Sequence, residues 1–338
     1  MSKYKNICAV STMYSLLLYL LYSREEDIKK TFFFFHHTIA DDISKGFKRQ
    51  CYKLPHFSNK GLTGNVKFRL LIWYKYIKFI KLPLFYNKKL FMQDHLEHSA
   101  IMIGYKNYTL IEDAPGAFNF YENGFWGKID REFRARRAYV IKKVLCGPTI
   151  YKSFGHNEQC TDIILSSKYD LDYLNQKRLH YVDIKDNWAE TSDNKKEYIR
   201  KLLSLDDIDT KLYAGKSIIL FTQPLYNGCV SRSVHEKIYR KIVSKYPQNQ
   251  LVIKVHPRDM FPYETVFPKT VVVRNTLPSQ FLQMLGIRFE KAVTIFSTAV
   301  FDLGYDIAVD WYGTECHLGI LKYSGHVEPP VGANICEL

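Results

Sequence analysis

A His-Pro-Arg step, His256-Pro257-Arg258, closes a short apolar segment that begins at Leu251. The segment is rich in β-branched residues and Pro257 cannot donate to a sheet ladder, so we expect a strand that ends there. With Lys254, the step brings two permanent cations and one imidazole to the strand end. Ligands of open α/β sheets bind at the carboxyl ends of strands, and a phosphate suits these groups. An ordinary structural turn is the alternative for a lone His-Pro step.

Two other apolar segments of the second half also end in polar side chains. Residues 217–222 end at Thr222 and are followed by Gln223, and residues 291–296 are followed by Ser297 and Thr298. Hydroxyls and backbone N–H groups at a strand-to-helix junction can hold a phosphate near the positive end of the helix dipole. An ordinary helix N-cap would have the same sequence.

These strand ends belong together if the strands form one parallel sheet. Thr222, His256 and Ser297 would then meet at one edge of that sheet. The chain has neither a Walker A loop nor a G-x-G-x-x-G fingerprint, so a different phosphate site is expected.

A pair of carboxylates follows a predicted strand of the first half. Glu112 and Asp113 come directly after residues 108–111 and precede a Pro-Gly turn that ends at Gly116. Neighbouring carboxylates can raise the pKa of one of the two, which suits a general base. A helix cap or a solvated turn is the alternative.

The elements that carry these groups alternate between strand and helix. Residues 6–11 predict a first strand, residues 14–22 a buried helix, and residues 31–36 a second strand buried on both faces. The second half restarts at residue 217 with the same alternation. The pattern favours an α/β fold with two Rossmann-like domains.

Composition bounds the class of protein. A chain of 338 residues suits two domains, and we place their boundary between residues 208 and 209. Lys and Arg exceed Asp and Glu, 48 − 34 = +14, which favours polyanions or an anionic membrane surface over a purely solvated basic face. The basic aromatic segment 60–82 fits single-stranded nucleic acid or a membrane surface, or a helix with one buried aromatic face. The arginine-rich segment 125–145 fits an anionic acceptor or lipid headgroups. Residues 14–22 are too short to span a bilayer.

The cysteines argue against a metal site. There are seven, scattered, without a C-x-x-C pair or metal-ligand spacing. We expect reduced thiols in a cytoplasmic protein.

Four pieces, in this order, resemble the bacterial sialyltransferases of glycosyltransferase family 52, the lipooligosaccharide and capsule group. They are the opening strand and loop from Asn6 to Tyr14, the acidic motif Glu112 to Gly116, the His256-Pro257-Arg258 step, and Phe296-Ser297-Thr298. They span most of the chain, and the specificity lies in their order and spacing.

The resemblance implies a GT-B fold, with two Rossmann-like domains facing across a cleft. Residues 1–208 would form the acceptor-side domain and residues 209–338 the CMP-binding domain. It implies CMP-sialic acid as donor, inversion without a metal or other cofactor, and a terminal galactose of lipooligosaccharide or capsule as acceptor. The protein would act in the cytoplasm, at the anionic inner face of the membrane. It would bind no nucleic acid, and a homodimer is one option for its assembly.

The resemblance also implies residue roles. His256 would assist departure of the CMP phosphate, and Asp113 or Glu112 would deprotonate the acceptor. The remaining substrate-binding candidates are Pro257, Arg258, Lys254, Ser297, Thr298, Gln223, Thr222, Gln280 and Thr12. Two departures from the family pattern are Ala114, where a Gly is usual, and the loop after residue 222, which has no carboxylate. A relative using another nucleotide sugar, such as a glucosyltransferase, and a basic binding protein without enzymatic activity are the alternatives.

Overall fold

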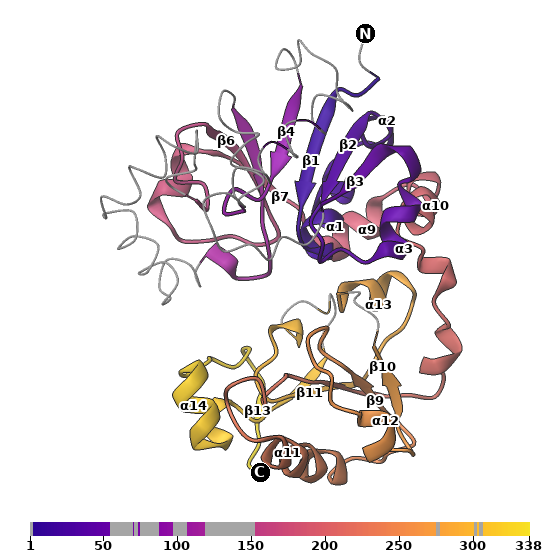
Figure 1. The fold of residues 1–338 in the computed structure, drawn as a ribbon, viewed down its shortest axis with the longest axis vertical. Helices are drawn as coiled ribbons and strands as arrows, with labels where there is room; N and C mark the ends of the chain where they lie inside the picture. The colour runs from indigo at the N-terminus through magenta and orange to yellow at the C-terminus, as the bar shows by residue number, and fades with distance from the viewer. Residues whose placement is uncertain are drawn as a thin grey trace. The chain divides into compact units, whose positions relative to one another are not determined.

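The structure, a computed structural model, describes residues 3–54, 70, 74, 88–96, 107–118, 153–274, 278–300, 303 and 307–338. The chain divides into two compact units, Met1–Leu205 and Asp206–Leu338, each built on its own sheet (Figure 1). Most of the basic segments 60–82 and 125–145 lie outside the described residues. No helix among the described residues is long and apolar enough to cross a membrane.

The described part of the first unit forms a seven-stranded parallel sheet in the order β3-β2-β1-β4-β5-β6-β7. Its strands are β1 Asn6–Val10, β2 Thr31–Phe35, β3 Cys51–Lys53, β4 Lys89–Met92, β5 Tyr108–Ile111, β6 Cys160–Leu165 and β7 Arg178–Tyr181. Its helices are α1 Met13–Tyr22, α2 Glu25–Lys29, α3 Asp41–Gly46, α9 Ile184–Glu190 and α10 Asp193–Leu202, with the 3₁₀ turns η1 Lys48–Gln50 and η2 Asp172–Gln176.

Helices cover the centre of this sheet, and its two first strands along the chain are buried throughout. Every residue of β1 and β2 is buried, which explains why both read as continuous apolar runs. α1 is apolar on all sides because it packs deep in the unit, and the Thr12 hydroxyl caps it by accepting from the Ser15 N–H. These three predicted elements are confirmed.

The described part of the second unit forms a six-stranded parallel sheet in the order β10-β9-β8-β11-β12-β13. Its strands are β8 Ile218–Phe221, β9 Leu251–Lys254, β10 Val271–Val273, β11 Lys291–Thr294, β12 Ala308–Trp311 and β13 Asn334–Ile335. Its helices are α11 Arg232–Ser244, α12 Tyr263–Val266, α13 Gln280–Met284 and α14 Leu318–Ser324, with the 3₁₀ turns η3 Leu205–Asp207, η4 Thr210–Tyr213, η5 Thr298–Val300 and η6 Thr314–Cys316 around them.

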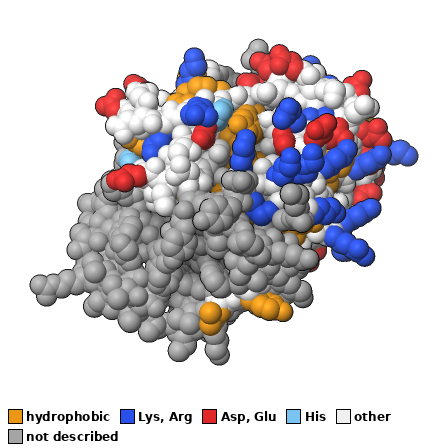
Figure 2. All heavy atoms as spheres, turned by 90° about the horizontal axis from the view of Figure 1, so that it is seen from above, with side chains coloured by type: hydrophobic (Ala, Val, Ile, Leu, Met, Phe, Trp, Pro, Cys, Tyr) orange, Lys and Arg blue, Asp and Glu red, His pale blue; other side chains and the backbone are white. Residues whose placement is uncertain are grey.

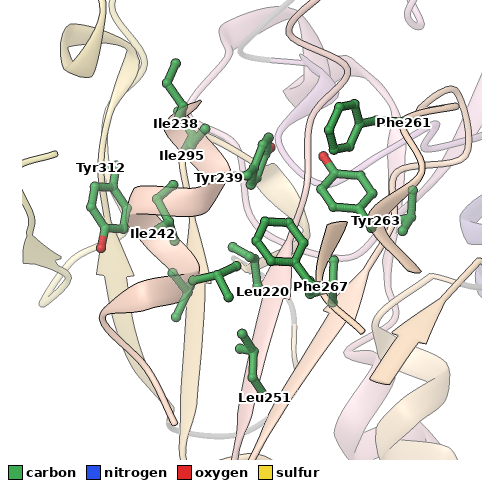
Figure 3. Close-up of a cluster of buried hydrophobic side chains, with 14 of the residues drawn as sticks. Leu220, Ile238, Tyr239, Ile242, Leu251, Phe261, Tyr263, Phe267, Ile295 and Tyr312 are labelled. Carbon is green, nitrogen blue, oxygen red and sulfur yellow. The ribbon is translucent and has the colours of Figure 1, made fainter. Parts of the chain in front are cut away.

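One face of this sheet packs against α11 and against aromatic residues in and beside α12 (Figure 3). Ile238, Tyr239 and Ile242 lie on one side of α11, at the spacing of an amphipathic helix, and contact the sheet. Tyr263 and Phe267 complete the cluster, so the loop that follows β9 is anchored in the core.

In both sheets the order in which strands are added reverses at the first strand of the unit. The chain builds outward from β1 to β3, or from β8 to β10, and then crosses to the other side of that strand. The strand order therefore reverses between β1 and β4 and between β8 and β11, where open α/β sheets bind ligands at the strands' carboxyl ends. In the second unit, Phe221 lies opposite both Lys254 and Thr294, so the three following loops start at one level.

Candidate active site

The His-Pro-Arg step forms a closed turn at the end of β9. The Asp259 N–H donates to the His256 carbonyl at 2.8 Å, and the Arg258 N–H donates to His256 Nδ1 at 3.1 Å. Since Nδ1 accepts, a neutral imidazole carries its proton on Nε2. In the described part of the chain Nε2 has no hydrogen-bond partner, so a donor N–H is left for a ligand.

Thr222, at the end of β8, holds this turn. Its hydroxyl accepts from the His256 N–H at 3.0 Å and donates to Asp259 Oδ2 at 3.1 Å. Thr222 is buried and its single hydroxyl proton is used. Its geometry therefore favours positioning of His256 over the substrate contact expected from the sequence.

Asp259 ties the turn to the core, and sequence reasoning overlooked it. Its carboxylate also accepts from the Tyr263 hydroxyl at 2.9 Å and from the Phe261 N–H at 3.0 Å. The Tyr263 oxygen in turn lies 2.9 Å from Nε2 of the buried His235. Burial raises the pKa of Asp259, and these donors oppose that rise. The only sequence signal was a carboxylate directly after His-Pro-Arg.

The electrostatics of this edge suit an anion. Burial, followed by the charges of Arg258 and Lys254, lowers the pKa of His256 to about 4. Burial lowers the pKa of Lys254 to about 8. At neutral pH the imidazole is thus neutral and Lys254 still mostly cationic. A bound phosphate would favour the charged form of both groups.

The end of β11 lies on the other side of β8. The Thr294 hydroxyl donates to the Phe221 carbonyl at 3.2 Å and accepts from the Ser297 N–H at 2.9 Å, which fixes the Ser297 backbone against β8. Ser297 is buried and Thr298 is exposed. Directly after Ser297, residues 298–300 form the 3₁₀ turn η5. Residues 301–302 and 304–306, where the sequence predicted a helix, lie outside the described residues.

Two weaker candidates border this edge. The Ser279 hydroxyl donates to the Ala299 carbonyl at 2.9 Å, which brings the start of α13, with the buried Gln280, beside η5. The Gln223 N–H donates to the Tyr239 hydroxyl at 2.7 Å and so anchors the loop after β8 on α11. The second unit thus brings together the strand ends of β9, β8 and β11, as the sequence predicted.

The two carboxylates after β5 differ in their surroundings. Glu112 is buried, and its carboxylate accepts from the Ser166 N–H at 2.6 Å and from the Tyr169 hydroxyl. Asp113 keeps 28% of its side chain exposed and accepts from the amide of Gln93. The geometry favours Glu112 as a structural tie to the loop after β6 and Asp113 as the group that can meet a substrate.

Thr12 and Gln93 connect the loops around Asp113 by hydrogen bonds. The Thr12 hydroxyl donates to the Asp113 carbonyl at 3.0 Å, and the Ser11 N–H donates to Gln93 Oε1 at 2.5 Å. The ends of β1, β4 and β5 therefore share one hydrogen-bond network at the first unit's reversal point.

Among the described residues no three His, Cys, Asp or Glu side chains gather as a metal site would require, and metal independence stays a prediction.

Comparisons with solved structures agree with this architecture. The chain is similar to the GT-B domain of a sialyltransferase from Photobacterium damselae, with a TM-score of 0.54, 12% identity and 90% of each chain covered. It is also similar to an α/β-galactoside α-2,3-sialyltransferase from Photobacterium phosphoreum, with a TM-score of 0.53, 9% identity and 99% of each chain covered. A UDP-GlcNAc 2-epimerase from Methanocaldococcus jannaschii gives a TM-score of 0.51 at 9% identity, covering 98% of this chain and 88% of that one. At such identities the likeness shows the GT-B fold alone.

Sequence comparison identifies the family. An uncharacterized protein of Haemophilus influenzae is 32% identical over 237 residues, which covers 70% of this chain and 71% of that protein. The model of glycosyltransferase family 52 matches residues 29–318, most of the chain and all of the second-unit strand ends described above. The chain is therefore a glycosyltransferase of GT-B fold that belongs to glycosyltransferase family 52.

Proposed function

We propose that this chain is an inverting, metal-independent sialyltransferase that moves sialic acid from CMP-sialic acid to a terminal galactose of a bacterial surface glycan. The observation that carries the proposal is the turn after β9, which presents the Nε2–H of His256 beside Lys254 and Arg258. It lies next to the end of β8, one of the two strands that flank the reversal point of a Rossmann-like sheet.

The proposed role of this edge is to hold the CMP phosphate as it leaves. Negative charge grows on the phosphate while the bond to the sugar breaks, and fixed donors stabilise that charge. Lys254 supplies a cation, His256 Nε2 a hydrogen-bond donor, and the Ser297–Thr298 hydroxyls further donors. Arg258 is suited to orient His256 or to bind the donor's carboxylate.

His256 serves first as a hydrogen-bond donor in this scheme. Its pKa of about 4 in the ligand-free protein makes it neutral at neutral pH. A phosphate nearby would raise that pKa, because an opposite charge favours the protonated ring. The imidazole then also supplies the proton that neutralises the leaving phosphate.

Asp113 is the proposed residue that prepares the acceptor hydroxyl. It is the more exposed of the two carboxylates, and the Gln93 amide fixes its orientation. Inversion follows from a single displacement, in which the acceptor oxygen bonds to the anomeric carbon as the CMP oxygen leaves from the opposite face.

We also propose that the protein works at the anionic inner face of the membrane, where a glycolipid acceptor is found. Basic residues precede several strands of the first unit. Backbone hydrogen bonds of 2.8 Å and 3.2 Å place Lys30, Lys5 and Lys89 side by side at the starts of β2, β1 and β4. Figure 2 shows Lys and Arg side chains gathered on this side, with Asp and Glu among them. Such a face suits anionic headgroups.

The test is thermal stability with CMP, UDP or GDP in separate samples, followed by transfer from CMP-sialic acid to lactose. A nucleotide at a hundred times its dissociation constant stabilises by about 2.7 kcal/mol. Stabilisation by CMP alone, reduced in His256→Ala and kept in Lys241→Ala on α11, supports the proposal. Stabilisation by UDP or GDP instead would keep the glycosyltransferase and discard sialic acid as the transferred sugar.

A further inference from the structure

Three consecutive residues after β4, Gln93-Asp94-His95, take separate structural roles at the reversal point of the first unit. Gln93 is fully buried and joins the Ser11 N–H to the Asp113 carboxylate. Asp94 is also buried, and it accepts from the N–H groups of Phe154 at 2.7 Å and Gly155 at 2.9 Å. The two side chains thus anchor the two residues that directly precede the third, His95.

His95 faces the oxygen of Asp113 that Gln93 does not hold. Its Nε2 lies 3.7 Å from Asp113 Oδ2, while the Gln93 amide donates to Oδ1. The His95 ring stacks on Phe154, with ring centroids 5.1 Å apart and an interplanar angle of 15°. Asp94 fixes the backbone of Phe154, so the ring that supports His95 is itself held.

The pair is both ordered and accessible. His95 keeps 25% of its side chain exposed and Asp113 keeps 28%. In the described part of the chain the other ring nitrogen of His95, Nδ1, makes no hydrogen bond. The arrangement is a carboxylate behind an imidazole whose second nitrogen has no hydrogen-bond partner among the described residues, the pattern of an activated base.

We propose that His95 is the group that takes the proton of the acceptor hydroxyl, with Asp113 holding the ring and stabilising the imidazolium. The inference rests on the proposed function and replaces direct deprotonation by Asp113 with a two-residue device. The proton moves to Nδ1, the acceptor oxygen bonds to the anomeric carbon, and the bond to the CMP phosphate breaks with its electron pair on the phosphate oxygen. Nothing is oxidised or reduced.

The chemistry favours the pair over a lone carboxylate. A base works best when its pKa lies near the working pH, and an imidazole comes closer than a solvated carboxylate. The charged groups that face His95 in the described structure are both acidic: Asp113 in the loop after β5 and Asp94 in the loop after β4. Negative charge on either stabilises the imidazolium once the proton has arrived.

The experiment compares His95→Ala and His95→Gln in transfer from CMP-sialic acid to lactose. A glutamine keeps an N–H that can reach Asp113 but cannot accept a proton, so it preserves a positioning role and removes a base. We expect both variants to lose about 10²- to 10⁴-fold in kcat. Added imidazole should restore part of the rate of His95→Ala. CMP should stabilise both variants as it does the wild type, since the proposed phosphate site lies in the other unit.

The matched control is His180→Ala. His180 pairs with Asp162 at 2.9 Å in the same unit, between β7 and β6, away from the reversal point. Its loss should leave kcat within about twofold of wild type. A His95→Gln variant as active as His180→Ala would overturn the inference while leaving the proposed function intact. A wild-type protein that transfers no sialic acid would overturn the proposed function and the inference with it.

Discussion

The backbone N–H of Arg258 donates to Nδ1 of His256 at 3.1 Å. A doubly protonated imidazole has only donors, so it would place two N–H groups against each other at this contact. The turn therefore opposes protonation of His256 in addition to the burial and the nearby cations that lower its pKa to about 4. It also fixes which nitrogen presents a proton to a ligand.

The tautomer predicts a difference between two substitutions of His256. His256→Gln can place an amide N–H near the former position of Nε2, whereas His256→Ala leaves no donor. We expect alanine to lower kcat by about 10²- to 10³-fold, as loss of one preorganised donor does. Glutamine should recover most of the CMP affinity and only part of the rate, measured by thermal shift and by sugar transfer. Equal CMP affinity in wild type and alanine variant would place the phosphate elsewhere.

The strands that the sequence predicted share a simple cause. β1, β2, β8 and β9 are buried along their whole length and β11 at all but its first residue, so these strands are mostly apolar and the runs were readable. β6, β7, β12 and β13 each keep exposed or half-buried positions, and β6 and β12 carry the polar residues Asp162 and Asp310. Their ladders form because a neighbouring strand supplies partners, which no local pattern records.

The residues of the candidate site also fall into those that the sequence could predict and those that it could not. His256 and Ser297 were predictable because each directly follows a readable strand. The contributions of Asp259 and His95 were not, since they depend on contacts with Thr222 and Asp113 from other strands. Sequence alone could not separate Glu112 from Asp113 either, because their difference is the burial of one carboxylate.

Removing the Thr222 hydroxyl should disturb both stability and catalysis. Thr222→Val leaves the His256 N–H without its acceptor and takes one donor from the buried Asp259. An unsatisfied buried group costs about 1–3 kcal/mol, so the urea midpoint should fall accordingly. Thr222→Ser keeps the hydroxyl and is the control. A valine variant with wild-type stability and wild-type kcat would remove Thr222 from the positioning of His256.

Acid should destabilise the second unit through His235. Its side chain is buried, and burial, with a smaller contribution from Arg232, lowers its pKa to about 4. The unfolded chain binds the proton near pH 6.5, so the stability is fully present above that pH and is lost as pH falls toward 4. The loss amounts to about 3 kcal/mol at most.

His235→Gln tests this, since glutamine can still donate to the Tyr263 oxygen but does not titrate. Urea unfolding at pH 7, 5.5 and 4.5 should show a shallower decline in the variant than in wild type. The raised pKa of Asp259 acts in the opposite direction and is common to both proteins, so the comparison isolates His235. Parallel declines would mean that the pKa of His235 does not differ between the folded and the unfolded protein.

Lys254 predicts that nucleotide binding weakens in mild alkali. Burial lowers its pKa to about 8, and a phosphate binds the protonated amine. From pH 7 to pH 9 the free protein loses that proton, while the phosphate of CMP, with a second pKa of about 6, keeps its charge. The Kd for CMP should therefore rise about tenfold over this range, measured by titration calorimetry. Lys254→Met should bind CMP more weakly at pH 7 and show no such dependence, and a Kd of wild type that stays constant from pH 7 to 9 would exclude Lys254 from the phosphate site.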